Sequence, residues 1–265
     1  MNDHVFIALL ITTIAGLSTG IGGLLSFFTK KTNTKFLSFS LGLSAGVMIY
    51  ISFMELIPNA KTFLVESEVP NYEWIVVLAF FCGVLLSLFI DMLVPEAENP
   101  HEIKMIESLN VDIQNFKLKR IGVITAISIT IHNFPEGIAT FMSAYSDINI
   151  GLSVGFAVAI HNIPEGIAVA IPVFFATASR KKSLLWSILS GFAEPIGAMA
   201  AYLILLPFIS NLVLGVVFAV VAGIMIFISL DELIPGAQKY GNNHLPTYGV
   251  LSGMIIMAFS LLLLN

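Results

Sequence analysis

Long, continuous apolar runs separated by short polar stretches dominate this chain of 265 residues. A helix needs about 20 mostly apolar residues to cross the hydrocarbon core of a bilayer, and eight runs meet that requirement. They cover residues 5–28, 36–58, 73–94, 121–144, 150–177, 183–206, 211–234 and 246–264. Because apolar residues follow one another instead of alternating with polar ones, the pattern argues against a transmembrane β-barrel.

The composition supports the same class of protein. Hydrophobic residues make up 57% of the chain and charged residues 11%, with a mean hydropathy of +0.94. Soluble domains carry about 25% charged residues. We therefore predict an all-α polytopic membrane protein with eight transmembrane helices in a single domain over residues 1–265. The first run lacks a basic leader and a small-residue cleavage site, so we interpret it as a retained span.

The positive charges indicate an orientation. All twelve Lys and Arg residues lie outside the predicted spans, and only Lys61 lies in an even-numbered connection. Since Lys and Arg concentrate in cytoplasmic loops, we predict a multi-pass protein of the cell (inner) membrane with both termini outside. The long third connection, at about residues 95–120, is then cytoplasmic. The basic residues form no stripe of the kind that binds nucleic acid, so we expect no nucleic-acid partner.

A repeated decapeptide indicates internal symmetry. Residues 51–60 (ISFMELIPNA) match residues 228–237 (ISLDELIPGA) at seven of ten positions. These stretches end the second and seventh spans, which run in opposite directions across the membrane. Antiparallel copies of one element are typical of inverted-topology repeats. We therefore predict that spans 1–3 and 6–8 form an inverted repeat around the central spans 4 and 5.

Two near-identical six-residue motifs, which we call the two phrases, contain the candidate ligands in those central spans. They are HNFPEG at residues 132–137 and HNIPEG at residues 161–166. In each, His and Glu stand four residues apart and share one helix face, with Asn at its edge. Ionisable groups inside a membrane usually mark an ion path, and no Lys or Arg lies in either span to neutralise them. A set of His, Glu and Asn suits a divalent transition metal, zinc above all.

Further carboxylates could join this set. Glu194 directly precedes Pro195, and Glu55 and Glu232 precede the prolines of the repeated decapeptide. Each could bind the cation or could be a protonated structural carboxyl, because burial raises a carboxyl pKa. The candidate metal ligands are His132, Asn133, Glu136, His161, Asn162, Glu165, Glu194 and Glu55.

At these residues the chain resembles the ZIP family of zinc and iron permeases, most closely its ZupT-like (GufA-like) branch. The resemblance covers the eight spans, the outside termini, the long third connection, both phrases and the Glu194–Pro195 pair. It implies a transporter that imports divalent metal through a binuclear site between the fourth and fifth helices. Many relatives carry a His-rich third loop, whereas this one has only His101.

The resemblance also implies how the ligands divide between two metal positions. One position would use His132, Glu136, His161 and Glu165, with Glu55 nearby. The other would use Asn133, Glu136, Asn162, Glu165 and Glu194, so that Glu136 and Glu165 bridge the two.

Several alternatives stay open at the level of sequence. A metal-selective channel would use the same ligands with weaker binding. An intramembrane metalloprotease is disfavoured, because the His-Glu-x-x-His pattern of zinc proteases is absent. We expect no catalytic cofactor, zinc as the transported substrate, and acceptance of iron, manganese, cobalt or cadmium. The lipid bilayer is an expected partner, and a homodimer is possible.

Overall fold

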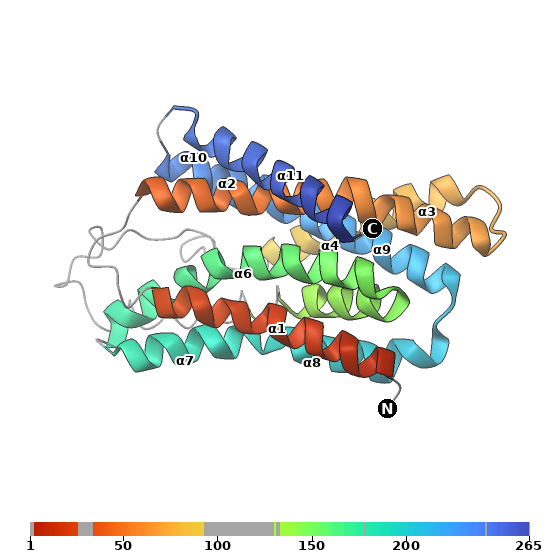
Figure 1. The fold of residues 1–265 in the computed structure, drawn as a ribbon, viewed down its shortest axis with the longest axis horizontal. Helices are drawn as coiled ribbons and strands as arrows, with labels where there is room; N and C mark the ends of the chain where they lie inside the picture. Colours follow the sequence, from red (N-terminus) through yellow and green to blue (C-terminus); the bar gives the residue numbers. More distant parts are fainter. Residues whose placement is uncertain are drawn as a thin grey trace.

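The computed structural model describes residues 3–25, 34–92, 130, 133–177, 179–241 and 243–264. These residues are helical apart from short turns, and none of them forms a strand. His132 and the predicted third connection, residues 95–120, lie outside the described residues. Figure 1 shows the described helices packed side by side along the long axis of the molecule.

The helices of the first half are α1 (Asp3–Leu25), α2 (Thr34–Ile51), α3 (Ile57–Glu66) and α4 (Tyr72–Met92). Residues 133–146 form a further helix, followed by α6 (Ile148–Thr177). The second half contains α7 (Arg180–Gly191), α8 (Ala193–Ala200), α9 (Asn211–Ile228), α10 (Ile234–Tyr240) and α11 (Leu245–Leu264). Single π-helical turns at Ser52–Leu56, Ala201–Leu205 and Ser229–Leu233 join consecutive helices, and a 3-10 turn spans Leu206–Phe208.

Seven helices in the described part of the chain are long and apolar enough to cross a membrane. They are His4–Leu25, Ser38–Glu66, Tyr72–Met92, Ile148–Ile167, Arg180–Phe208, Asn211–Lys239 and Leu245–Leu263. The prediction of an all-α polytopic membrane protein is confirmed. Only residues 130 and 133–144 of the predicted fourth span are described, so the count of eight remains a prediction.

The second and seventh spans run beyond their predicted ends. They continue past Pro58 and Pro235 to Glu66 and Lys239. Each proline sits in the first turn of the helix that follows a π-helical turn. The residue before each proline donates its N–H in the π pattern, Ile57 to the Ser52 carbonyl and Ile234 to the Ser229 carbonyl, so each proline lies where the hydrogen-bonding pattern changes. The repeated decapeptide thus gives the same local structure in both copies.

Helix packing follows the predicted inverted repeat. In Figure 1, α2 and α9 run in opposite directions. α9 packs against α3 and α4 of the first half of the repeat. In the same way, α2 packs against the corresponding helices of the second half, α10 and α11. Among the seven described spans, Asn211–Lys239, which contains α9, has the largest buried share of its apolar window, at 67%, and α4 has the smallest, at 17%. The core therefore lies along α9 and α2, while α4 lies at the outside of the bundle.

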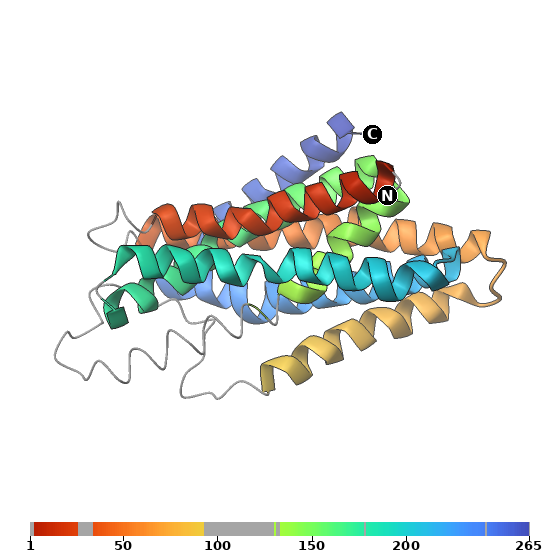
Figure 2. The same cartoon turned by 90° about the horizontal axis from the view of Figure 1, so that it is seen from below.

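The two ends of the bundle differ in charge. Both termini and the α3–α4 turn lie toward one end, which we call the terminal end (Figures 1 and 2). α2 and α7 begin, and α10 ends, at the opposite end. Those turns carry Lys35, the run Arg180–Lys182, and Lys239. We call this opposite end the basic end.

Candidate metal centre

The centre lies where the helix of residues 133–146 meets α6. His161 of α6 is 1% exposed, and Glu136 of the facing helix is 3% exposed. The His161 Nε2 atom lies 2.9 Å from Glu165 Oε1 and 3.7 Å from Glu136 Oε1. The imidazole of the second phrase therefore contacts the carboxylates of both phrases. Glu232 is also close enough to interact electrostatically with His161.

Asn162 links the second phrase to Glu194 of α8. The Asn162 side-chain amide donates hydrogen bonds to Glu194 Oε1 and, at 2.8 Å, to the Ala15 carbonyl of α1. Glu194 is fully buried and interacts electrostatically with Glu136 and Glu165. Asn162 Oδ1 and Glu194 Oε2 have no hydrogen-bond partner among the described residues. Two buried oxygens are thus open to a ligand that supplies positive charge.

The charge balance of the centre is strongly negative. Glu194 interacts electrostatically with Glu136 and with Glu165, and both Glu136 and Glu194 are buried. Residues 121–179 contain no Lys or Arg. Three carboxylates cannot all stay ionised in such a site without a compensating charge. A bound cation would supply that charge.

The structure does not hold the ligands in a closed cage. Within the described ranges, no three His, Cys, Asp or Glu side chains are grouped closely enough to hold a metal ion as they stand. His161 instead contacts Glu165 at hydrogen-bond distance. A metal must displace this contact before it can bind the imidazole nitrogen.

Neighbouring spans approach both phrases closely through their backbones. A side-chain carbon at Gly137 would collide with the backbone of Glu194, and one at Gly166 would collide with the carbonyl of Thr19. Thr19 belongs to α1 and Glu194 to α8. The glycine after each Pro-Glu pair therefore lets a neighbouring span approach the phrase directly.

The predicted ligands separate into three groups. Glu136, His161, Asn162, Glu165 and Glu194 meet at the centre. Asn133 is fully buried beside them, where its side-chain amide lies 3.5 Å from the Ser190 carbonyl. His132 lies outside the described residues.

Glu55 interacts with a different set of residues. Asn59 donates a hydrogen bond of 3.1 Å to Glu55 Oε1, and Asp147 interacts electrostatically with the same carboxylate. Asp147 lies in the turn between residues 133–146 and α6, which Figure 1 places at the terminal end. Glu232, which is near His161, is absent from the predicted ligand set. The repeated decapeptide pairs it with Glu55 and is the sequence signal that could have added it.

Comparison with known proteins shows the family to which the chain belongs. A sequence model of the ZIP Zinc transporter family matches residues 95–261. The chain is 56% identical to the Zinc transporter ZupT of Streptococcus mutans, over 99% of both chains. It is 53% identical to the Zinc transporter ZupT of Lysinibacillus sphaericus and to that of Chlorobium phaeovibrioides, over the full length of each. The chain belongs to the ZIP zinc transporter family, a family of membrane transporters and not of enzymes.

Proposed function

We propose that the protein carries divalent cations, with Zn²⁺ as the main substrate, into the cytoplasm through the centre between residues 133–146 and α6. The observation that carries this proposal is the meeting of His161 with Glu136 and Glu165, close to the fully buried Glu194, in a region where residues 121–179 contain no Lys or Arg. The naming of the relatives as zinc transporters supports Zn²⁺ as the substrate.

The ligands divide between two adjacent metal positions. His161 serves the first, together with His132, and Asn133, Asn162 and Glu194 serve the second. Glu136 and Glu165 bridge them. The two open oxygens at the second position, Asn162 Oδ1 and Glu194 Oε2, support this division. Imidazole nitrogen and carboxylate oxygen are common zinc ligands, while the many oxygens broaden acceptance toward iron, manganese, cobalt and cadmium.

Binding requires the centre to open. An arriving cation separates His161 from Glu165 and takes both as ligands, and any proton held between them leaves. The cation then neutralises carboxylates that are costly to keep ionised away from water. Because the centre is buried, the cation cannot pass without movement of helices around it.

The direction of transport depends on the orientation of the chain. The basic end carries Lys35, Arg180 and Lys239, which favours placing it in the cytoplasm. The terminal end, with both chain termini, then faces outward. Uptake means that the cation enters from the terminal end.

The test is metal flux in proteoliposomes. The wild-type protein is compared with the double variant His161→Ala/Glu165→Ala under a Zn²⁺ gradient, with Fe²⁺, Mn²⁺ and Mg²⁺ as competitors. Glu73→Ala, which removes an exposed carboxylate at the start of α4, is the matched control. We expect saturable Zn²⁺ flux in the wild type and the control, and none in the double variant.

Other outcomes separate the alternatives. Flux that rises linearly with Zn²⁺ concentration would indicate a channel in place of a carrier. No Zn²⁺ flux in the wild type under any gradient would overturn the proposal.

A further inference from the structure

A polar stripe leads from the centre to the terminal end of the bundle. Glu136, Thr140, Ser143 and Asp147 follow one another at spacings of four, three and four residues. At 100° per residue, all four fall within about 60° of one another around the helix axis. The stripe therefore runs along one face of the helix of residues 133–146 and ends in the turn before α6.

The two hydroxyls in the middle of the stripe are buried and unsatisfied. Thr140 is 0% exposed and Ser143 is 1% exposed, and neither hydroxyl oxygen has a hydrogen-bond partner in the part of the chain that the structure describes. A buried hydroxyl on a helix normally bonds to the carbonyl four residues earlier. Thr12 does so with Ala8 at 2.9 Å, and Ser52 with Met48 at 2.7 Å. Two open hydroxyls in sequence are available to a hydrated cation.

Two carboxylates from different segments of the chain interact where the stripe reaches the terminal end. Asp147 is exposed, and its Oδ1 atom accepts hydrogen bonds from the backbone N–H groups of Asn149 and Ile150 at 2.7 and 3.2 Å. It interacts electrostatically with Glu55, which belongs to the π-helical turn after α2. Negative charge at the mouth of a path raises the local concentration of cations.

The second phrase is not followed by a matching polar stripe along α6. Since the two phrases are antiparallel copies, the positions on α6 that correspond to Thr140, Ser143 and Asp147 lie 29 residues later. They are Val169, Pro172 and Ala176, which offer no side-chain oxygen. The polar stripe therefore exists on one of the two copies only.

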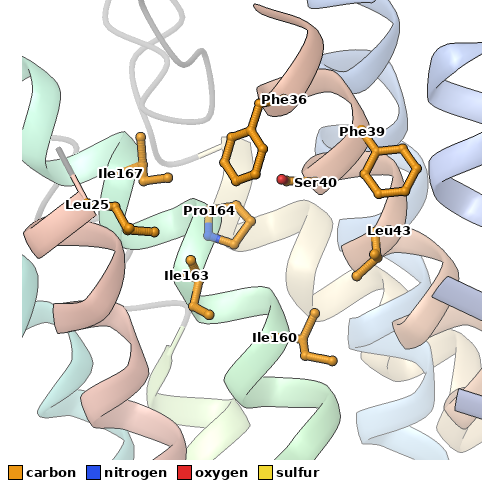
Figure 3. A pocket seen from close by; sticks show the side chains of 9 residues that line it. All are labelled: Leu25, Phe36, Phe39, Ser40, Leu43, Ile160, Ile163, Pro164 and Ile167. Atoms are coloured by element: carbon orange, nitrogen blue, oxygen red, sulfur yellow. The ribbon is translucent and has the colours of Figure 1, made fainter. Parts of the chain in front are cut away.

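The structure also shows an apolar cavity beside α6. Its volume is about 310 Å³, and it lies between α1, α2 and α6. Figure 3 shows Phe36, Leu43 and Ile163 facing it, and Ser40 has the one side-chain hydroxyl among its nine lining residues. Such a lining repels a cation, so this cavity does not extend the path.

We infer that Thr140 and Ser143 are transient oxygen ligands on the access path of the cation, and that Asp147 and Glu55 capture it at the mouth. The cation passes from the two carboxylates to the hydroxyls and then to Glu136 at the centre. This inference rests on the proposed function.

A flux experiment tests the hydroxyls. The double variant Thr140→Val/Ser143→Ala removes both oxygens; the first change keeps the shape of the side chain, and the second shortens it by one atom. Thr12→Val is the control, because it makes the same substitution at a buried threonine whose hydroxyl already has a partner. In proteoliposomes, Zn²⁺ flux of the double variant should fall about tenfold. This is the effect expected when the highest-energy state of transport loses an interaction worth about one net hydrogen bond.

Equilibrium Zn²⁺ binding by the same purified variants should stay within about twofold of the wild type, since the centre is untouched. Wild-type flux in the double variant would overturn the inference and leave the proposed function standing. Absence of Zn²⁺ flux in the wild type would overturn both.

Cysteine labelling tests where the path opens. Thr140→Cys, Ser143→Cys and Val169→Cys are placed singly in a Cys82→Ser background and treated in sealed vesicles with a membrane-impermeant cationic thiol reagent. An N-terminal tag identifies which face carries the termini. From that face, the first two cysteines should react at least about tenfold faster than the third, and Zn²⁺ should slow them. Equal labelling of all three, or no effect of Zn²⁺, would contradict the inference.

Discussion

Replacing Gly16 by alanine tests whether a close backbone contact between α1 and α7 holds Glu194 in place. A methyl group on Gly16 would stand 2.5 Å from the Gly191 carbonyl oxygen and 3.2 Å from the Cβ atom of Glu194. A carbon atom and a carbonyl oxygen in favourable contact lie about 3.3 Å or more apart, so α1 would have to move away by roughly 0.8 Å. That movement would also shift Ala15, whose carbonyl holds Asn162.

Two effects of opposite sign determine how much Gly16→Ala changes the free energy of unfolding. Alanine stabilises a helix over glycine by about 0.5–1 kcal/mol. Overpacking costs about 1–3 kcal/mol, and the upper part of that range applies because a backbone carbonyl cannot rotate away as a side chain does. We expect Gly16→Ala to lower the free energy of unfolding by about 1–2.5 kcal/mol.

Gly236→Ala is the matched control. The nearest atom to its new methyl group is the Leu41 Cδ1 atom at 3.3 Å, at the end of a flexible side chain. Overpacking is therefore small in this variant, and the higher helix stability of alanine is the main effect. In thermal unfolding of the purified protein in detergent, Gly16→Ala should melt about 2–10 °C below the wild type. Gly236→Ala should melt at or above the wild-type temperature. Equal shifts in the two variants, or a Gly16→Ala protein as stable as the wild type, would refute the reasoning.

Three further predictions concern transport and orientation. Glu165→Ala should abolish Zn²⁺ flux yet elute as a folded protein in size-exclusion chromatography, because a bridging carboxylate is lost; wild-type flux would remove Glu165 from the centre. Zn²⁺ flux should weaken as pH falls, because His161 and the carboxylates bind metal only when deprotonated; flux that rises steadily with acidity would indicate proton coupling instead. Impermeant thiol reagents applied to intact cells should label Glu68→Cys and spare Lys181→Cys; the reverse pattern would invert the orientation.

The sequence was sufficient to predict the helical architecture because apolar length is a local property. It also predicted that both termini share one end. The predicted ends of the second and seventh spans, at residues 58 and 234, were wrong, because both spans continue to Glu66 and Lys239. A π-helical turn before Pro58 and Pro235 places each proline at the start of a new helix, so the span continues. Proline alone does not show which of these geometries a sequence adopts.

The centre was predictable only in part. The spacing of His161 and Glu165 on one helix face follows from helix geometry. The contact of Asn162 with Glu194 does not, because it depends on how closely α1, α6 and α8 approach one another. Small residues set that approach, and their pattern is too common in membrane helices to be specific. The sequence also could not predict that the hydroxyls of Thr140 and Ser143 lack a hydrogen-bond partner among the described residues, because most such hydroxyls bond to a carbonyl of their own helix.

Zn²⁺ binding by the purified protein tests the central claim most directly. Equilibrium dialysis in detergent measures the number of ions bound per chain for the wild type, Glu165→Ala and Glu194→Gln. We predict two ions for the wild type, one for Glu194→Gln because the second position loses its own carboxylate, and none held tightly by Glu165→Ala because the bridge is gone. Equal Zn²⁺ binding in all three proteins would contradict the account.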